Sequence, residues 1–138
     1  MKAALFVAAM GLIPTSFAEQ LERFGDIQAH YVVLASTRIS PQIAEQHGIV
    51  RGADRALVNI ALRDESVAPI RGRISGTATN LIGQITQLRF REVLEDEAVY
   101  YLATFKHTDE EIFRFDIEIS IRGASPHHLR FQQKLYVE

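Results

Sequence analysis

Residues 76–121 constrain the fold more than any other part of this sequence, because they read as three consecutive strands joined by two acidic turns. The last of these strands, over residues 111–121, alternates apolar and polar side chains with a period of two, which is typical of a strand with one buried face. Its apolar side is formed by Phe113, Phe115, Ile117, Ile119 and Ile121. The strand before it, over residues 98–106, is apolar on both sides. These patterns predict antiparallel β-sheet.

Seven segments along the chain have the pattern of strands. They span residues 24–36, 54–63, 71–79, 84–94, 98–106, 111–121 and 128–137. A short helix is predicted after the first strand, because Ser40 caps free amide groups, Pro41 suits the first turn and Gly48 ends the helix cheaply. So many strands with so little helix predict an all-β fold, an immunoglobulin-like antiparallel β-sandwich. A small closed barrel is the alternative.

The first 18 residues have the pattern of a secretory signal peptide. Lys2 supplies a positive start, residues 3–13 are apolar, Pro14 breaks the run, and residues 16–18 are suited to signal peptidase. The apolar run is too short for the roughly 30 Å hydrocarbon core, which needs about 20 residues. A retained anchor is the alternative. We therefore expect a signal peptide over 1–18 and a single domain over 19–138 in the periplasm of a Gram-negative bacterium.

Charge and cysteine content exclude several classes of function. The chain has 15 Lys and Arg against 17 Asp and Glu, and losing Lys2 with the signal leaves 14 against 17, a net charge of −3. No basic face is concentrated enough to predict binding to nucleic acid or to an anionic membrane. The absence of cysteine rules out disulfides, thiol chemistry and a lipoprotein anchor.

Six separated blocks of sequence resemble a known family when they are taken together. They read RALVNI (55–60), GTATNLIGQ (76–84), FRE (90–92), YYLATF (100–105), FRFD (113–116) and FQQ (131–133). These blocks are similar to the bacterial exported proteins grouped as domain of unknown function 4426, and the resemblance covers residues 21–136. It implies a secreted or periplasmic single domain with an immunoglobulin-like sandwich. It implies no activity, because the family has no assigned catalytic residues.

Metal binding is one hypothesis for the loops. If neighbouring strands run antiparallel, the helix and the turns at 80–83 and 107–110 lie at one end of the molecule, and the turn at 95–97 lies at the other. His47, His107 and Asp109 then become candidate ligands, since imidazole with carboxylate suits zinc or copper. No HxH or HExxH spacing fixes two ligands on one element, so solvated turn residues are the alternative interpretation. No cofactor is predicted.

No catalytic motif is present. None of the serines lies in a GxSxG elbow, and Gly72 and Gly76 are not followed by the GK[ST] ending of a phosphate loop. The two acidic turns are separated by a strand's length, so their carboxylates cannot form one catalytic pair. We therefore expect a protein that is not an enzyme.

Protein binding is the preferred hypothesis, because residues 98–106 present apolar side chains on both faces and a sandwich sheet needs only one. The second face is covered within the chain, by a partner or by a second copy. The candidate partner-face residues are Arg89, Arg91, Tyr101, Phe105 and Arg114. We expect a binding or accessory module that acts through a sheet face or edge. The alternative is a small-molecule or metal-binding domain that uses the loops at the helix end.

Overall fold

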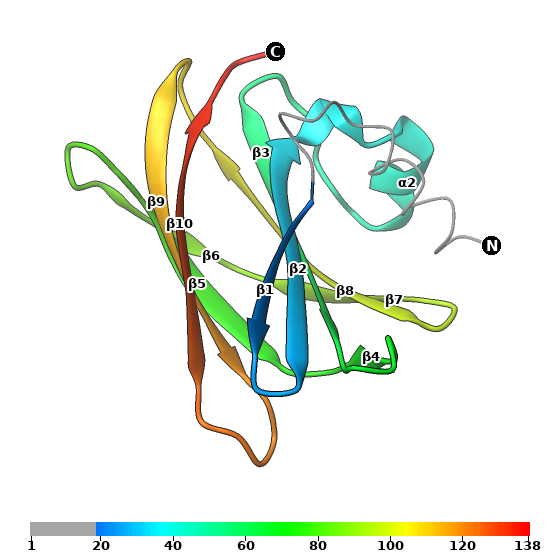
Figure 1. Ribbon diagram of the computed structural model, residues 1–138. Coiled ribbons are helices and arrows are strands. Elements are labelled where there is room, and N and C mark those ends of the chain that lie inside the picture. The colour runs from blue at the N-terminus through cyan, green and yellow to red at the C-terminus, as the bar shows by residue number, and fades with distance from the viewer. Residues whose placement is uncertain (1–18) are drawn as a thin grey trace.

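The computed structural model describes residues 19–138 and forms two antiparallel sheets packed face to face (Figure 1). The predicted signal peptide lies outside the described residues. In residues 19–138, no helix has the length and apolar character needed to cross a membrane. The predicted all-β sandwich is confirmed.

The larger sheet has six strands in the order β1-β2-β3-β8-β7, with β4 paired to β3. They are β1 (Gln20–Phe24), β2 (Ile27–Ala35), β3 (Arg55–Arg63), β4 (Pro69–Ile70), β7 (Arg91–Glu95) and β8 (Ala98–Lys106). The smaller sheet has four strands in the order β10-β9-β5-β6. They are β5 (Arg73–Asn80), β6 (Ile85–Leu88), β9 (Glu111–Ser120) and β10 (His127–Leu135).

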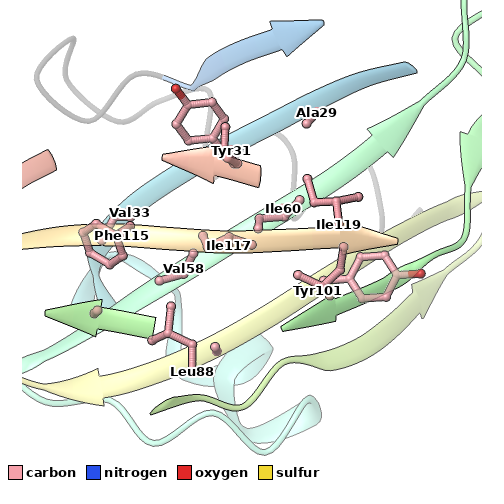
Figure 2. Packing of buried hydrophobic residues seen from close by; sticks show 14 of the residues in the cluster. Ala29, Tyr31, Val33, Val58, Ile60, Leu88, Tyr101, Phe115, Ile117 and Ile119 are labelled. Carbon is pink, nitrogen blue, oxygen red and sulfur yellow. The ribbon is translucent and has the colours of Figure 1, made fainter. Parts of the chain in front are cut away.

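The main core lies between the two sheets, where alternate residues of facing strands meet (Figure 2). Val58 and Ile60 of β3 pack in the same cluster as Phe115 and Ile117 of β9, and all four are buried almost completely. Burial of this kind stabilises the fold by about 1.5–3 kcal/mol for each large side chain. Figure 2 shows Tyr101 in the same cluster, with its hydroxyl directed away from Val58 and Ile117.

Helix α2 (Pro41–Gln46) covers the outer face of the larger sheet. It follows a short 3-10 turn, η2 (Ser36–Arg38). The hydroxyl of Ser40 accepts a hydrogen bond from the amide of Ile43 at 3.2 Å, which is the predicted cap. Ile43 packs in a second apolar cluster with Tyr100 and Leu102 of β8. The second apolar face of β8 is therefore covered within the chain.

The predicted strands differ from the structure in three places, apart from small shifts of strand ends. Pro69 and Ile70, which lie between two predicted strands, form the short strand β4. Residues 20–23, which were not predicted as a strand, form the edge strand β1 together with Phe24, and the turn at 25–26 separates it from β2. The sequence did not reveal β1 because a strand with polar residues on both faces has no apolar alternation. The predicted strand over 84–94 divides into β6 and β7, which belong to different sheets. Leu88 and Phe90, on either side of the point where the chain changes sheets, both pack against the core between the sheets. The apolar alternation therefore continues through this point and does not reveal the change of sheet. The described residues thus form ten strands instead of the seven predicted.

Candidate functional site

The five predicted partner-face residues do not form one surface. Tyr101 and Phe105 are each only 4% exposed and belong to the core between the sheets. Arg91 donates a hydrogen bond to the carbonyl of His47 beneath the helix end. Arg114 lies in β9, on the exposed face of the smaller sheet, and Arg89 lies in the link between β6 and β7. Tyr101 and Phe105 are covered by the smaller sheet, and α2 packs on the opposite face of β8, so both faces of this strand are covered within residues 19–138.

The three predicted metal ligands have separate partners. His47 Nε2 lies 2.6 Å from Glu95 Oε1. His107 Nδ1 lies 2.8 Å from the carbonyl oxygen of Thr108, and Asp109 Oδ1 accepts a hydrogen bond from the amide of Val137. Across residues 19–138, no three His, Cys, Asp or Glu side chains are grouped so that they could hold a metal ion.

The pairing of His47 with Glu95 also corrects the predicted distribution of loops between the two ends. The helix end was expected far from the turn at 95–97 because strands alternate in direction. Instead, α2 lies back across the larger sheet, and its last turn reaches the end of β7. A helix that packs on a sheet face is not confined to the end at which it leaves the sheet.

The hairpin between β5 and β6 carries three exposed apolar side chains. Leu81 is 62% exposed, Ile82 80% and Ile85 64%. Hairpin tips usually contain Gly, Asn, Asp or Ser, so adjacent Leu and Ile at a tip are unusual. Figure 1 shows this hairpin, in green, projecting beyond the rest of the molecule. Exposed apolar groups of this kind mark interaction sites when they gather on one surface.

The hairpin has a defined geometry that holds its apolar tip in place. The amide of Gly83 donates to the carbonyl of Asn80 at 3.1 Å, and the amide of Asn80 donates to the carbonyl of Gln84 at 3.0 Å. Gly83 has φ +86°, which suits the left-handed position of a three-residue loop with a bulge. The side-chain amide of Asn80 also donates to Gln84 Oε1 and to Glu111 Oε2, each at 2.8 Å. These bonds tie the base of the hairpin to β9.

Strand β6 forms one edge of the smaller sheet. Because Asn80 bonds to Gln84 and antiparallel pairs alternate, Ala78–Thr86 and Gly76–Leu88 are the hydrogen-bonded pairs. The amide and carbonyl groups of Ile85 and Gln87 therefore point away from β5. No backbone hydrogen bond from residues 19–138 covers these groups. The edge thus offers two donor and acceptor pairs beside the apolar tip.

Acidic side chains flank the tip. A hollow of about 230 Å³ is lined by residues of the hairpin and by Glu110, Glu111 and Ile112. Glu110 pairs with Lys134 at 3.2 Å, and Glu111 accepts a hydrogen bond from the amide of Thr108. The tip therefore combines exposed apolar side chains with nearby carboxylates.

Sequence reasoning treated residues 80–83 only as a turn and did not single out Leu81, Ile82 or Ile85. A signal for them was present, because two large apolar residues stood between the turn-forming Asn80 and Gly83. The edge position of β6 had no such signal, since strand order within the sheets does not follow from alternation.

Solved structures with the same fold include one protein of substantial sequence similarity. It is a DUF4426 family protein from Pseudomonas aeruginosa PAO1, with 30% identity and a TM-score of 0.80, covering 87% of this chain and 96% of that chain. FetP of uropathogenic Escherichia coli strain F11 has 14% identity and a TM-score of 0.61, with 85% of this chain and 93% of that chain covered. A copper-bound variant of FetP has 14% identity and a TM-score of 0.64, with 88% and 92% covered.

The likeness to FetP, at this low identity, concerns the fold alone. No curated protein matches this sequence. The family described as Domain of unknown function (DUF4426) matches residues 21–138, in agreement with the six sequence blocks. The chain therefore belongs to the DUF4426 family.

Proposed function

We propose that this protein is a non-enzymatic binding module that takes an extended segment of a partner protein along the free edge of β6. The observation that carries the proposal is the unpaired backbone of Ile85 and Gln87 beside the exposed apolar tip. An extended peptide that adds a strand to a sheet edge gains main-chain hydrogen bonds, and neighbouring side chains select its sequence. Leu81, Ile82 and Ile85 would contact apolar side chains of the peptide.

The charge around the tip adds to the selectivity. Glu110 is well exposed, with a side-chain exposure of 63%, and within residues 19–138 its one ion-pair partner is Lys134. A basic residue of the partner, placed beyond its apolar residues, would pair with Glu110. The proposed ligand is thus a short extended segment with apolar residues followed by Lys or Arg.

The proposed compartment is the periplasm. The support for it is the signal-like pattern of residues 1–18, with a positive start, an apolar run and small residues at its end. The FetP variant binds copper, and the donor groups in residues 19–138 give no reason to propose copper binding for this chain.

The test uses proline, which removes one backbone donor. Gln87→Pro deletes an amide that points away from β5, so the hairpin keeps its own ladder. Gln87→Ala is the matched control, because it removes the same side chain and keeps the amide. A photoreactive residue at position 82 is used in both variants to cross-link partners in the native cell, and thermal unfolding confirms that both variants fold.

We expect the cross-linked partner to be retained by Gln87→Ala and reduced up to about tenfold by Gln87→Pro, which loses one backbone hydrogen bond. Equal capture by the two variants would contradict strand addition. A cross-linked product with twice the mass of the chain would show that the edge binds a second copy of this chain instead of another protein.

A further inference from the structure

A second hollow lies at the end of β5 remote from the hairpin. It has a volume of about 490 Å³ and is lined by Arg71, Gly72, Arg73, Glu92, Ser120, Ile121 and Arg122. These residues come from the link between β4 and β5, from the start of β5, from β7, and from the end of β9 with the two residues that follow it. Because β5 has eight residues, this hollow is separated from the apolar tip by roughly 25 Å at about 3.3 Å per residue.

A hydrogen-bond network fixes the position of one arginine in the wall. Arg71 pairs with Glu92 through two contacts, Nη2 to Oε1 at 2.5 Å and Nε to Oε2 at 3.2 Å. The buried hydroxyl of Tyr101 donates to Glu92 Oε2 at 2.9 Å and accepts the amide of Gly72 at the same distance. Two-contact pairing of guanidinium with carboxylate gives a defined geometry, so Arg71 is held in place before any ligand arrives.

Gly72 brings the two sides of the hollow together. A Cβ atom at this position would lie 2.9 Å from the carbonyl oxygen of Ser120 and 3.2 Å from Leu62 Cδ1. Only glycine therefore permits the start of β5 to approach the end of β9 so closely. This close approach places Arg73 and Arg122 on the same hollow as Arg71.

The charge of the hollow differs from that of the whole chain. The chain has a formal charge of −2, whereas three arginines and one glutamate line the hollow, giving a local charge of +2. In residues 19–138, the side chains of Arg73 and Arg122 have no hydrogen-bond or ion-pair partner, and both residues are exposed. Their guanidinium groups are therefore available to a ligand, while Arg71 is already paired with Glu92.

We propose that this hollow, named here the arginine cleft, binds a small molecule through a dianionic oxyanion group. Two free guanidinium groups match the two negative charges and the planar or forked oxygens of such a group. The volume lies within the range of small-molecule sites, about 300–1,000 Å³. Phosphate monoesters and dicarboxylates share this chemistry. The cleft is separate from the edge of β6, so the two proposals stand or fall independently.

The test is calorimetric titration of the purified protein at constant ionic strength. The probes are inorganic phosphate, glycerol 3-phosphate and succinate, with acetate as the monoanion. We expect saturable binding of at least one dianion and weaker binding of acetate. Stronger binding of the phosphates than of succinate would assign the cleft to phosphorylated ligands, and the reverse order to dicarboxylates. Saturable binding of none of the probes up to about 10 mM, a threshold of about −3 kcal/mol, would overturn the proposal.

Charge-matched variants separate a specific site from a general effect of positive charge. Arg73→Gln and Arg122→Gln each remove one charge from the arginine cleft, and Arg114→Gln removes one from the exposed face of the smaller sheet. We expect the first two to weaken dianion binding about tenfold each, which is typical of one charge-assisted hydrogen bond, and the third to leave it unchanged. Equal weakening by all three variants would identify an adventitious ion only. Gln87→Pro should bind the dianion normally.

Discussion

Tyr101 shows how a single side chain combines packing with polar organisation. Its ring is buried between the sheets, while its hydroxyl holds both Glu92 and the amide of Gly72. Burial raises the pKa of the Tyr101 phenol. Hydrogen bonds from Arg71 and from Tyr101 lower the pKa of Glu92. The sequence indicated Tyr101 as an interface residue because an apolar ring with a hydroxyl suits either a protein interface or the core. The alternation of residues between the two faces of the strand does not distinguish these two positions.

Tyr101→Phe should destabilise the protein while leaving its packing intact. The substitution deprives the Gly72 amide of its acceptor and Glu92 of one donor, and an unsatisfied buried group costs about 1–3 kcal/mol. The free energy of unfolding in urea measures this loss. Tyr136→Phe is the control, because Tyr136 is exposed and the same substitution there should remove no buried hydrogen bond. Equal stability of the two variants would contradict the role given to the Tyr101 hydroxyl.

At the scale of elements, the sequence predicted several strands closely from their apolar pattern, whether it alternated or covered both faces. The predicted strand at 98–106 coincides with β8, and those at 54–63 and 111–121 differ from β3 and β9 by one residue. The cap at Ser40 and the end at Gly48 placed α2 correctly, because capping depends on local residue chemistry. The fold class followed from these local signals.

The candidate site was less predictable because it depends on strand order. That β6 lies at an edge, and that the chain changes sheets after Leu88, are consequences of packing between segments distant in sequence. The arginine cleft likewise joins residues from three segments, between Arg71 and Arg122. Alternation within one segment carries no information about such neighbours. The turn at 80–83 was predicted, but its apolar residues indicate a binding site only because they lie beside the free edge of β6.

At the scale of the whole molecule, contacts between β1, β2 and β10 join the two sheets on one side. His127 Nε2 lies 2.5 Å from Glu22 Oε2, and the His127 ring stacks on Phe24 with centroids 4.0 Å apart. Gln133 donates to the carbonyl of Val33 at 2.9 Å. On the other side, the chain itself passes from β6 to β7 and links the sheets. Both sides of the sandwich are therefore tied together, and β6 keeps its outer backbone groups free.

Stability should fall in acid. Hydrogen bonds from Arg71 lower the pKa of Glu92, and a hydrogen bond from His128 lowers that of Asp116. A carboxyl whose pKa is lowered by folding stabilises the folded state above its ordinary value, and this contribution is lost as pH falls through the folded value. The free energy of unfolding should therefore decline below about pH 4.5, the ordinary value for glutamate.

Urea unfolding at several pH values measures this decline, and Glu92→Gln removes one of the responsible carboxyls. We expect the variant to lose less stability than the unaltered protein between pH 5 and about pH 3. An identical slope for both proteins would show that Glu92 does not contribute to the acid sensitivity.

The central claim is that β6 is an open edge suited to strand addition, and amide hydrogen exchange of the purified protein tests it most directly. The amides of Ile85 and Gln87 should exchange rapidly, because they point away from β5, whereas those of Thr86 and Leu88 should be protected by the ladder to Ala78 and Gly76. When the cross-linked partner is added, Ile85 and Gln87 should become protected as well. Equal protection of all four amides in the protein alone would contradict the open edge and, with it, the proposed function.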